Sequence, residues 1–303
     1  MSLAPFQVYE VHENAPRRME TVGSKKKFWF KRDEGSWLFK EGRQDQGEDW
    51  AEVLAAACAE LLGLPHARYE LANWRGVRGV VTRRITADDV DLVLGNELLA
   101  QRDPNYPAGH GSRFVRVREH TLDAVLAVAG AGGVGFPQDW TPPGGVVTPG
   151  DVFCGYVLLD AWIGNTDRHH QNWGLLVNPV QGTRQLAPTF DHASSLGAHE
   201  LDETREQRLG SADKGYSIEA YVRRAESKFH RTPADKKPMT TLEAFQALSA
   251  RAEPGRWLER LARASKDWMV EQIARIPRER MSGPARAFAQ AMLEANRKRI
   301  LEA

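Results

Sequence analysis

The 303-residue sequence predicts an α+β fold of two lobes, a small β-rich lobe over residues 1–90 and a larger, mostly α-helical lobe over residues 91–303. Aromatic-rich extended runs are concentrated before residue 90. From Pro149 onward, apolar residues recur at the spacing of buried helices. Between these parts, residues 104–111 and 130–150 are rich in Gly and Pro, which is typical of surface loops and not of a linker between independent domains.

The first lobe reads β-β-β-α-β-β. Residues 6–11 roughly alternate between apolar and polar, and residues 28–30 and 37–39 flank a turn composition in the manner of a hairpin. Apolar side chains at helical spacing then run from Glu48 to Leu62, and Gly63 is a natural helix stop. Two extended runs follow, at residues 67–72 and 77–85.

The second lobe contains one helical segment near residues 122–129 and a buried helix that begins near Pro149. A short strand-like run at residues 185–187 precedes a second polar loop. Four further helices are predicted at residues 217–226, 241–250, 255–276 and 283–301.

Composition and charge favour an ordinary globular protein. The 41 Lys and Arg residues balance 40 Asp and Glu, so nothing in the net charge of +1 predicts direct binding to nucleic acid or to a membrane. The beginning of the sequence does not resemble a signal peptide, and no run approaches the roughly 18 apolar residues of a membrane span. Cys58 and Cys154 each lie in an apolar helical stretch, which predicts buried thiols and a cytoplasmic location.

The most informative segment, residues 163–176, is a polar loop between two apolar stretches. Phosphoryl transfer needs one carboxylate beside the attacking hydroxyl and oxygen ligands for magnesium near the terminal phosphate. Asp167 can supply the first carboxylate, and Asn172 on the same loop can supply a metal ligand. Asp191, after the strand-like run, can supply the second ligand. Taken singly, each of these residues would more often be a cap or turn residue, and it is their combination that predicts transfer of the ATP γ-phosphate.

The first lobe offers the phosphate-binding groups that such a reaction requires. Lys40 ends the second aromatic strand and can reach the α- and β-phosphates if a helix carboxylate fixes its ammonium, for which Glu52 is the best placed. Gly23, Ser24 and Lys27 belong to a basic turn that can approach phosphates through backbone N–H groups and a lysine. The turn lacks the Walker A spacing, and read alone it is a solvated turn.

With these residues in place, the sequence resembles the HipA-like serine/threonine kinases. The resemblance implies a two-lobed protein-kinase-like fold related to protein and phosphoinositide kinases, with ATP and Mg²⁺ as cofactors. It implies Asp167 as catalytic base, Asn172 and Asp191 as metal ligands, and Lys40 on the phosphates with Glu52 as its partner. The matching segments are residues 22–27, 38–40, 52–65, 164–172 and 190–197.

The resemblance also implies features outside the catalytic set. The phosphate acceptor is a protein or the chain itself, and Ser24 is the counterpart of a regulatory phosphoserine in the Gly-rich loop. A small antitoxin-like partner is implied by the toxin–antitoxin systems of the family. The extra N-terminal subdomain of the longer members is not present at the start of this sequence.

Three other interpretations remain. A small-molecule kinase of the aminoglycoside or homoserine type shares the Asp-x4-Asn arrangement, and a non-catalytic binding module could use the same fold. The histidines near the loop suggest a zinc site, but the H-E-x-x-H and C-x-x-C spacings are absent. His169 is therefore expected to orient the loop or to hydrogen-bond Asp191.

Overall fold

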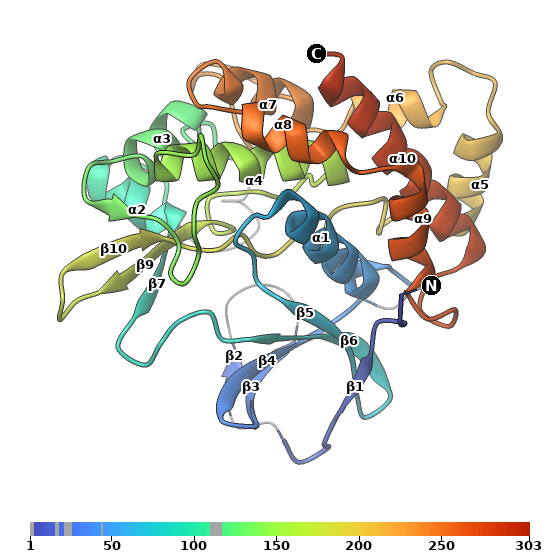
Figure 1. Ribbon diagram of the computed structural model, residues 1–303, viewed down its shortest axis with the longest axis horizontal. Coiled ribbons are helices and arrows are strands. Elements are labelled where there is room, and N and C mark those ends of the chain that lie inside the picture. Colours follow the sequence, from blue (N-terminus) through green and yellow to red (C-terminus); the bar gives the residue numbers. More distant parts are fainter. Residues whose placement is uncertain (1–2, 16–17, 21–25, 44, 110–116) are drawn as a thin grey trace.

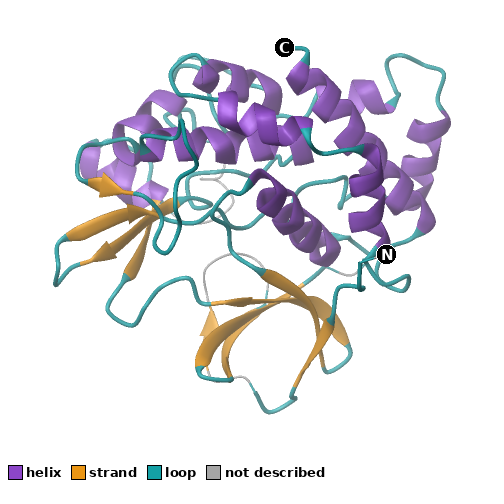
Figure 2. Cartoon of the chain, viewed as in Figure 1, coloured by secondary structure: helices purple, strands orange, loops and turns teal. Residues whose placement is uncertain are grey.

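The N-terminal lobe is built on a 6-stranded sheet with strand order β1-β5-β6-β4-β3-β2. In this computed structural model, the described residues are 3–15, 18–20, 26–43, 45–109 and 117–303. Figure 2 shows the sheet below a mostly helical lobe, and Figure 1 shows α1 lying between the two. The strands are β1 (Val8–Val11), β2 (Arg18–Glu20), β3 (Lys27–Arg32), β4 (Gly35–Glu41), β5 (Tyr69–Trp74) and β6 (Val77–Arg83).

The β3–β4 hairpin decides which way Lys40 points. Phe28 pairs with Phe39 across the hairpin, and their rings stack with centroids 5.0 Å apart in a small aromatic core on one face of the sheet. Successive side chains of a strand point to opposite faces, so Lys40 lies on the other face, toward α1. The alternation of the strand thus carries a charged side chain inward beside a buried phenylalanine.

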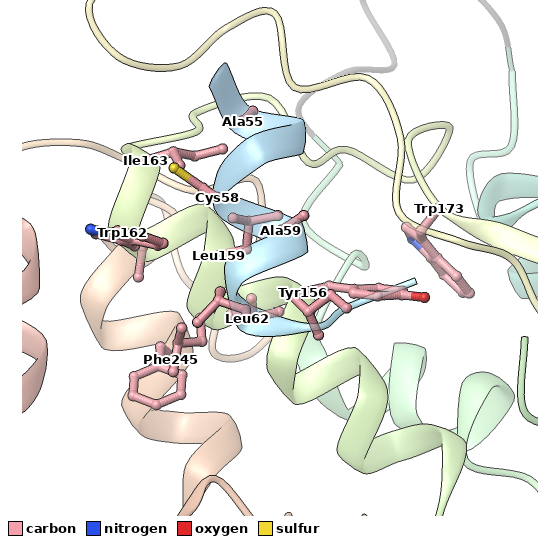
Figure 3. Close-up of a cluster of buried hydrophobic side chains, with 14 of the residues drawn as sticks. Ala55, Cys58, Ala59, Leu62, Tyr156, Leu159, Trp162, Ile163, Trp173 and Phe245 are labelled. Atoms are coloured by element: carbon pink, nitrogen blue, oxygen red, sulfur yellow. The ribbon is translucent and has the colours of Figure 1, made fainter. Parts of the chain in front are cut away.

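Helix α1 (Glu48–Leu62) connects the lobes through its apolar side chains. It ends at Gly63, whose φ of 65° is the left-handed conformation that favours glycine. Figure 3 shows Ala55, Cys58, Ala59 and Leu62 from α1 packed near Leu159, Trp162 and Ile163. The latter three belong to α4 (Pro149–Ile163), so the two helices share one core.

Helix α4 is the centre of the second lobe and is buried along nearly its whole length. It begins with a capping box in which Thr148 and Asp151 satisfy each other's backbone N–H groups, and it ends at Gly164 with φ 64°. The polar loop at residues 165–172 therefore starts at a fixed point on a buried helix. The other helices are α2 (Gly95–Arg102), α3 (Leu122–Ala129), α5 (Asp202–Gly210), α6 (Ile218–Arg223), α7 (Thr241–Ser249), α8 (Gly255–Ala262), α9 (Lys266–Ala274) and α10 (Gly283–Leu301).

A second, 4-stranded sheet with the order β7-β9-β10-β8 flanks the polar loop. Strand β9 follows that loop directly and pairs antiparallel with β10, which leads toward Asp191. The two polar loops are thus held by the same sheet. Its strands are β7 (Asp91–Leu94), β8 (Val134–Gly135), β9 (Gly174–Asn178) and β10 (Thr183–Leu186).

The predicted fold class is confirmed, with one error in the helical part. The predicted helix at residues 255–276 is wrong, because it is two helices separated at residues 263–265, where the Ser265 hydroxyl accepts from Trp268 N and begins α9. Helices α2 and α5 and the strands of the second sheet except β10 were not predicted. Cys58 and Cys154 are buried thiols in helices, as expected. Within the described residues, none of the helices combines the length and the apolar character that crossing a membrane requires.

Candidate active site

Lys40 and Glu52 form a buried ion pair between the sheet and α1. Lys40 Nζ lies 2.8 Å from Glu52 Oε1, and both side chains are almost fully removed from solvent. The other oxygen of Glu52, Oε2, accepts from His192 N at 2.8 Å. Both oxygens of the carboxylate are therefore used, one on the ammonium and one on the backbone that follows Asp191.

The same ammonium contacts Asp191, so three distant parts of the chain meet at one cation. Lys40 Nζ donates to Asp191 Oδ1, and Asp191 N donates to the Tyr69 hydroxyl at 3.1 Å. Asp191 has φ 59°, a left-handed conformation that Asp tolerates better than most residues and that marks a constrained position. Its side chain remains about one-third exposed, at 31%. An external ligand can therefore reach this carboxylate.

The charge of Lys40 is maintained by its neighbours. Burial alone would lower the pKa of Lys40, but the carboxylates of Asp191 and Glu52 outweigh it and hold that pKa well above its ordinary value. The side chain is therefore a permanent cation at physiological pH. A fixed positive charge beside an accessible carboxylate suits a polyphosphate with a bound metal ion.

A buried ion pair between Arg168 and Asp160 fixes the loop at residues 165–172 to helix α4. Asp160, on the last turn of α4, accepts from Arg168 Nε at 2.5 Å and from Arg168 Nη2 at 2.7 Å. Asn165 Nδ2 donates to the same carboxylate at 2.8 Å, and Arg168 Nη1 donates to Asn172 O at 3.0 Å. The two ends of the loop are thus tied to a single residue of the buried helix.

Within the loop, Asp167 and Asn172 are joined directly. Asn172 Nδ2 donates to Asp167 O at 2.7 Å, while Asp167 N donates to Asn165 Oδ1 at 3.1 Å. The Asp167 side chain is 36% exposed, so an external hydroxyl can approach its oxygens. Thr166 N donates to Ser194 O at 3.2 Å, which places this loop beside the segment that follows Asp191.

His169 lies next to Asp167 and forms part of the loop turn. Its Nδ1 accepts from Gln171 N at 3.1 Å, and its Nε2 is 3.9 Å from Asp167 Oδ2. Burial outweighs the nearby carboxylates and lowers the pKa of His169 below its ordinary value, so the ring is neutral at pH 7. The hydrogen bond to Gln171 fits the loop-orienting alternative better than a hydrogen bond to Asp191.

The oxygen atoms of Asn172 and Asp191 fit Mg²⁺, which prefers oxygen ligands and binds proteins through one or two carboxylates together with substrate phosphates. Because the Asn172 amide nitrogen is engaged by Asp167 O, its Oδ1 is the atom available as a ligand. Among the described residues, no group of three or more His, Cys, Asp and Glu side chains could hold a metal ion. One carboxylate and one amide oxygen suit an ion that takes its remaining ligands from phosphate and water.

The turn that the sequence predicts to bind phosphates is only partly within the described residues. Gly23 and Ser24 lie outside them, so the interpretation of Ser24 as a phosphosite stays a prediction. Lys27 begins β3 and is paired directly with Lys40 on β4. Residues directly opposite each other in an antiparallel pair share a face, so Lys27 lies on the same face of the sheet as Lys40.

Some residues of the site could not be identified from the sequence. Tyr69 holds the backbone at Asp191, and Lys228 has its Nζ 3.8 Å from Asp167 Oδ1. Both are brought to the loops by packing of segments that are distant in the sequence. The pairing of Arg168 with Asp160 could have been suspected from the sequence, because charged residues at the end of a buried apolar helix require partners.

The N-terminus of α1, the helix that carries Glu52, is fixed by two arginines. Arg280 Nη1 lies 3.0 Å from Asp49 Oδ2 in a fully buried pair, and Arg78 Nη2 is also 3.0 Å from the same oxygen. Arg280 also donates to Ala72 O at 3.2 Å and to Asn73 Oδ1 at 2.5 Å. The segment just before α10 thereby holds α1 and β5 together.

Comparisons with known proteins identify the fold. No family model matches the sequence, and no curated protein sequence matches it. The Helicobacter pylori proinflammatory kinase CtkA matches in structure with a TM-score of 0.72 and 18% identity, over 98% of this chain and 96% of CtkA. Shewanella oneidensis HipA, solved with HipB and operator DNA, matches with a TM-score of 0.56 and 11% identity, over 94% of this chain and 67% of HipA. The chain therefore has the HipA-like kinase fold, with a curled sheet in its N-lobe and helices in its C-lobe.

Proposed function

We propose that the protein is an ATP-dependent serine/threonine protein kinase whose acceptors include its own chain. The observation that carries the proposal is the position of the Lys40 ammonium, which is bound at once by Glu52 of α1 and by Asp191 after β10. Such a cation, fixed between the lobes and next to a partly exposed carboxylate, is the arrangement that binds nucleotide phosphates in kinases.

Asp167 is proposed as the catalytic base because its side chain is 36% exposed on a loop that is held in place by the buried Arg168–Asp160 pair. The hydroxyl of the acceptor would lose its proton to Asp167 as its oxygen forms a bond to the γ-phosphorus. The bond between that phosphorus and the β–γ bridging oxygen breaks, and ADP leaves with the electron pair. Asn172 and Asp191 would hold Mg²⁺, which when bound neutralises phosphate charge. Lys27 and Lys40 would contact the phosphates from the sheet.

The proposal is tested by incubating purified protein with Mg²⁺ and γ-labelled ATP and locating the label by mass spectrometry. Transfer to serine or threonine in the chain or in an added protein supports the proposal, and a label on Ser24 would identify the regulatory site. Label found only on an added aminoglycoside or amino-acid alcohol would instead indicate a small-molecule kinase.

The control for this experiment is Asp167→Asn, which removes the base but keeps a side chain of the same shape. It should abolish labelling while the melting temperature stays within a few degrees of the wild type. Unchanged labelling in both Asp167→Asn and Asp191→Asn would disprove the site assignment. An unlabelled wild-type protein that still has its biological effect would favour a binding module.

A small antitoxin-like partner is proposed by analogy with HipA, whose solved complex contains HipB and operator DNA. The test is to co-express the chain with the product of a neighbouring small helix-turn-helix gene, if the genome has one, and to measure co-elution and growth. Independent elution and an unchanged effect on growth would reject the partner without affecting the proposed phosphotransfer.

A further inference from the structure

Lys228 lies beside the proposed catalytic base although it belongs to a segment between α6 and α7. Its Nζ is 3.8 Å from Asp167 Oδ1, and its side chain is only 15% exposed. A lysine on a solvated loop normally keeps its charged ammonium in water. A lysine that is mostly buried against the proposed base therefore needs a specific explanation.

The backbone on both sides of Lys228 is fixed. Ser227 N and Ser227 Oγ both donate to Met239 O at 2.8 Å, and Met239 N donates to Phe229 O at 2.8 Å. The Phe229 ring is buried, with its centroid 4.7 Å from that of His120 and 6.3 Å from that of Phe153 on α4. The backbone of Lys228 is thus held between two buried residues, Ser227 and Phe229.

His120 connects this backbone to the catalytic loop. Trp173, the residue after Asn172, donates from Nε1 to His120 Nε2 at 3.1 Å, and His120 Nδ1 lies 3.0 Å from Lys228 O. An indole nitrogen can only donate and a carbonyl oxygen can only accept, so the imidazole carries its proton on Nδ1. A single tautomer therefore joins the end of the Asp167–Asn172 loop to the backbone of Lys228.

Arg168 and His169, the two residues that follow Asp167, do not offer a positive charge to the reacting phosphate. Arg168 is 1% exposed, and its guanidinium is directed to Asp160 and to Asn172 O. His169 accepts at Nδ1 from the backbone N–H of Gln171, so its ring is neutral and carries its proton on Nε2. The ammonium of Lys228 therefore adds a positive charge that these two residues do not provide.

We propose that Lys228 is a further catalytic residue, which moves its ammonium from Asp167 to the γ-phosphate oxygens while the phosphoryl group is transferred. The proposal rests on the proposed function. Negative charge is spread over the equatorial oxygens of the phosphoryl group in the transition state, and a lysine binds phosphate as a mobile point charge. The proton of the attacking hydroxyl still goes to Asp167, and ADP still carries away the electron pair, so Lys228 contributes charge and transfers no proton.

The test compares Lys228→Ala and Lys228→Arg with Lys237→Ala, a change at an exposed lysine of the same segment. Labelling with γ-labelled ATP gives kcat and KM. Calorimetry measures affinity for Mg–ADP and for Mg–ADP with aluminium fluoride, which imitates the transferred phosphoryl group. Thermal melting reports on the fold of each variant.

Loss of one preorganised donor to a developing charge lowers kcat by roughly 100-fold, which is the expected result for Lys228→Ala. Its KM for ATP and its affinity for Mg–ADP should stay within about threefold of the wild type, whereas the aluminium fluoride complex should weaken by about the factor lost in kcat. Lys228→Arg should recover part of the loss because the charge is kept, and Lys237→Ala should match the wild type.

Two results would overturn the role of Lys228. One is a Lys228→Ala variant whose kcat stays within about threefold of the wild type. The other is an equal loss of Mg–ADP affinity, aluminium fluoride affinity and melting temperature, which would indicate a structural ion pair. Failure of the proposed function would appear differently, as a wild-type protein that does not turn over ATP at all.

Discussion

Arg168 and Asp160 form a two-pronged buried ion pair, with Nε 2.5 Å from Oδ2 and Nη2 2.7 Å from Oδ1. The pair joins the proposed catalytic loop to the last turn of α4, the most buried helix of the second lobe. Its charges cannot be returned to water without unfolding the loop. The geometry of the loop and the stability of the lobe therefore depend on the same two side chains.

Asp160→Asn should destabilise the protein by about 3–5 kcal/mol, because Arg168 would be left as a buried and uncompensated charge. Urea unfolding monitored by tryptophan fluorescence measures the change. The matched control is Asp88→Asn, which breaks the exposed Arg84–Asp88 pair and should cost less than about 1 kcal/mol. Equal effects of the two substitutions would contradict the importance given to the buried pair.

The double variant Asp160→Leu, Arg168→Met should recover much of that stability, since a buried ion pair is often replaced by apolar residues without loss. It should not recover activity, because Asn172 O loses the donor that Arg168 provides. The comparison of unfolding free energy with the rate of ATP turnover separates the two roles. Recovery of both quantities would show that the pair serves stability alone.

Glu52→Gln should lower kcat/KM for ATP by roughly 100-fold, because Lys40 loses the carboxylate that fixes its ammonium. Steady-state kinetics over a range of ATP concentrations measures the effect. Glu60→Gln is the control on the same helix, since that residue is exposed and should leave the kinetics unchanged. Turnover by Glu52→Gln at the wild-type rate would exclude the proposed Lys40–Glu52 arrangement.

Stability should fall as the pH decreases below about 6.5, because His120 and His192 are buried and neutral. Burial lowers the pKa of both histidines well below the ordinary value, so the unfolded chain takes up protons that the folded protein does not. Their contribution is fully present above the unfolded pKa and is lost on acidification, at about 1.4 kcal/mol per pH unit for each histidine.

The measurement is the free energy of unfolding at several pH values between 5 and 8 for the wild type and for His192→Gln. Removal of His192 should reduce the slope of unfolding free energy against pH by the contribution of one histidine, about 1.4 kcal/mol per pH unit. A variant whose pH dependence is identical to that of the wild type would show that His192 is not neutral in the folded protein.

Gly79→Ala should destabilise the sheet by about 1–3 kcal/mol and weaken ATP binding. A Cβ at this position would lie 2.3 Å from Lys40 O, so β6 could not stay at its present distance from β4. Gly132→Ala is the control, because a Cβ there would meet no atom within 4 Å. In Gly79→Ala the melting temperature should fall and the KM for ATP should rise. In Gly132→Ala neither quantity should change.

The parts of the fold that local patterns determine could be predicted from the sequence. The hairpin around Phe28 and Phe39, the helix stop at Gly63, and the helices Leu122–Ala129 and Gly283–Leu301 depend on neighbouring residues and were predicted closely. The break between α8 and α9 was missed because apolar side chains recur at helical spacing on both sides of it. A tight turn at Arg263 ends the first helix, and the capping bond of Ser265 begins the second.

The candidate site divides in the same way. Asp167 and Asn172 could be proposed together because both lie on one loop, and the order of Lys40, Glu52 and Asp191 made a common site plausible. Lys228 and Tyr69 could not be found, since their positions depend on how distant segments pack. The geometry now joins Lys40, Glu52 and Asp191, while the role of each residue stays a proposal.

The pair between Arg280 and Asp49 has a consequence for synthesis of the protein. Arg280 follows Asp49 by 231 positions in the sequence, yet it holds the start of the helix that carries Glu52. Contacts between such distant residues form only when both have left the ribosome. A growing chain thus contains its proposed base and metal ligands before Arg280 is made, and until then the start of α1 has only Arg78 of its two arginine partners.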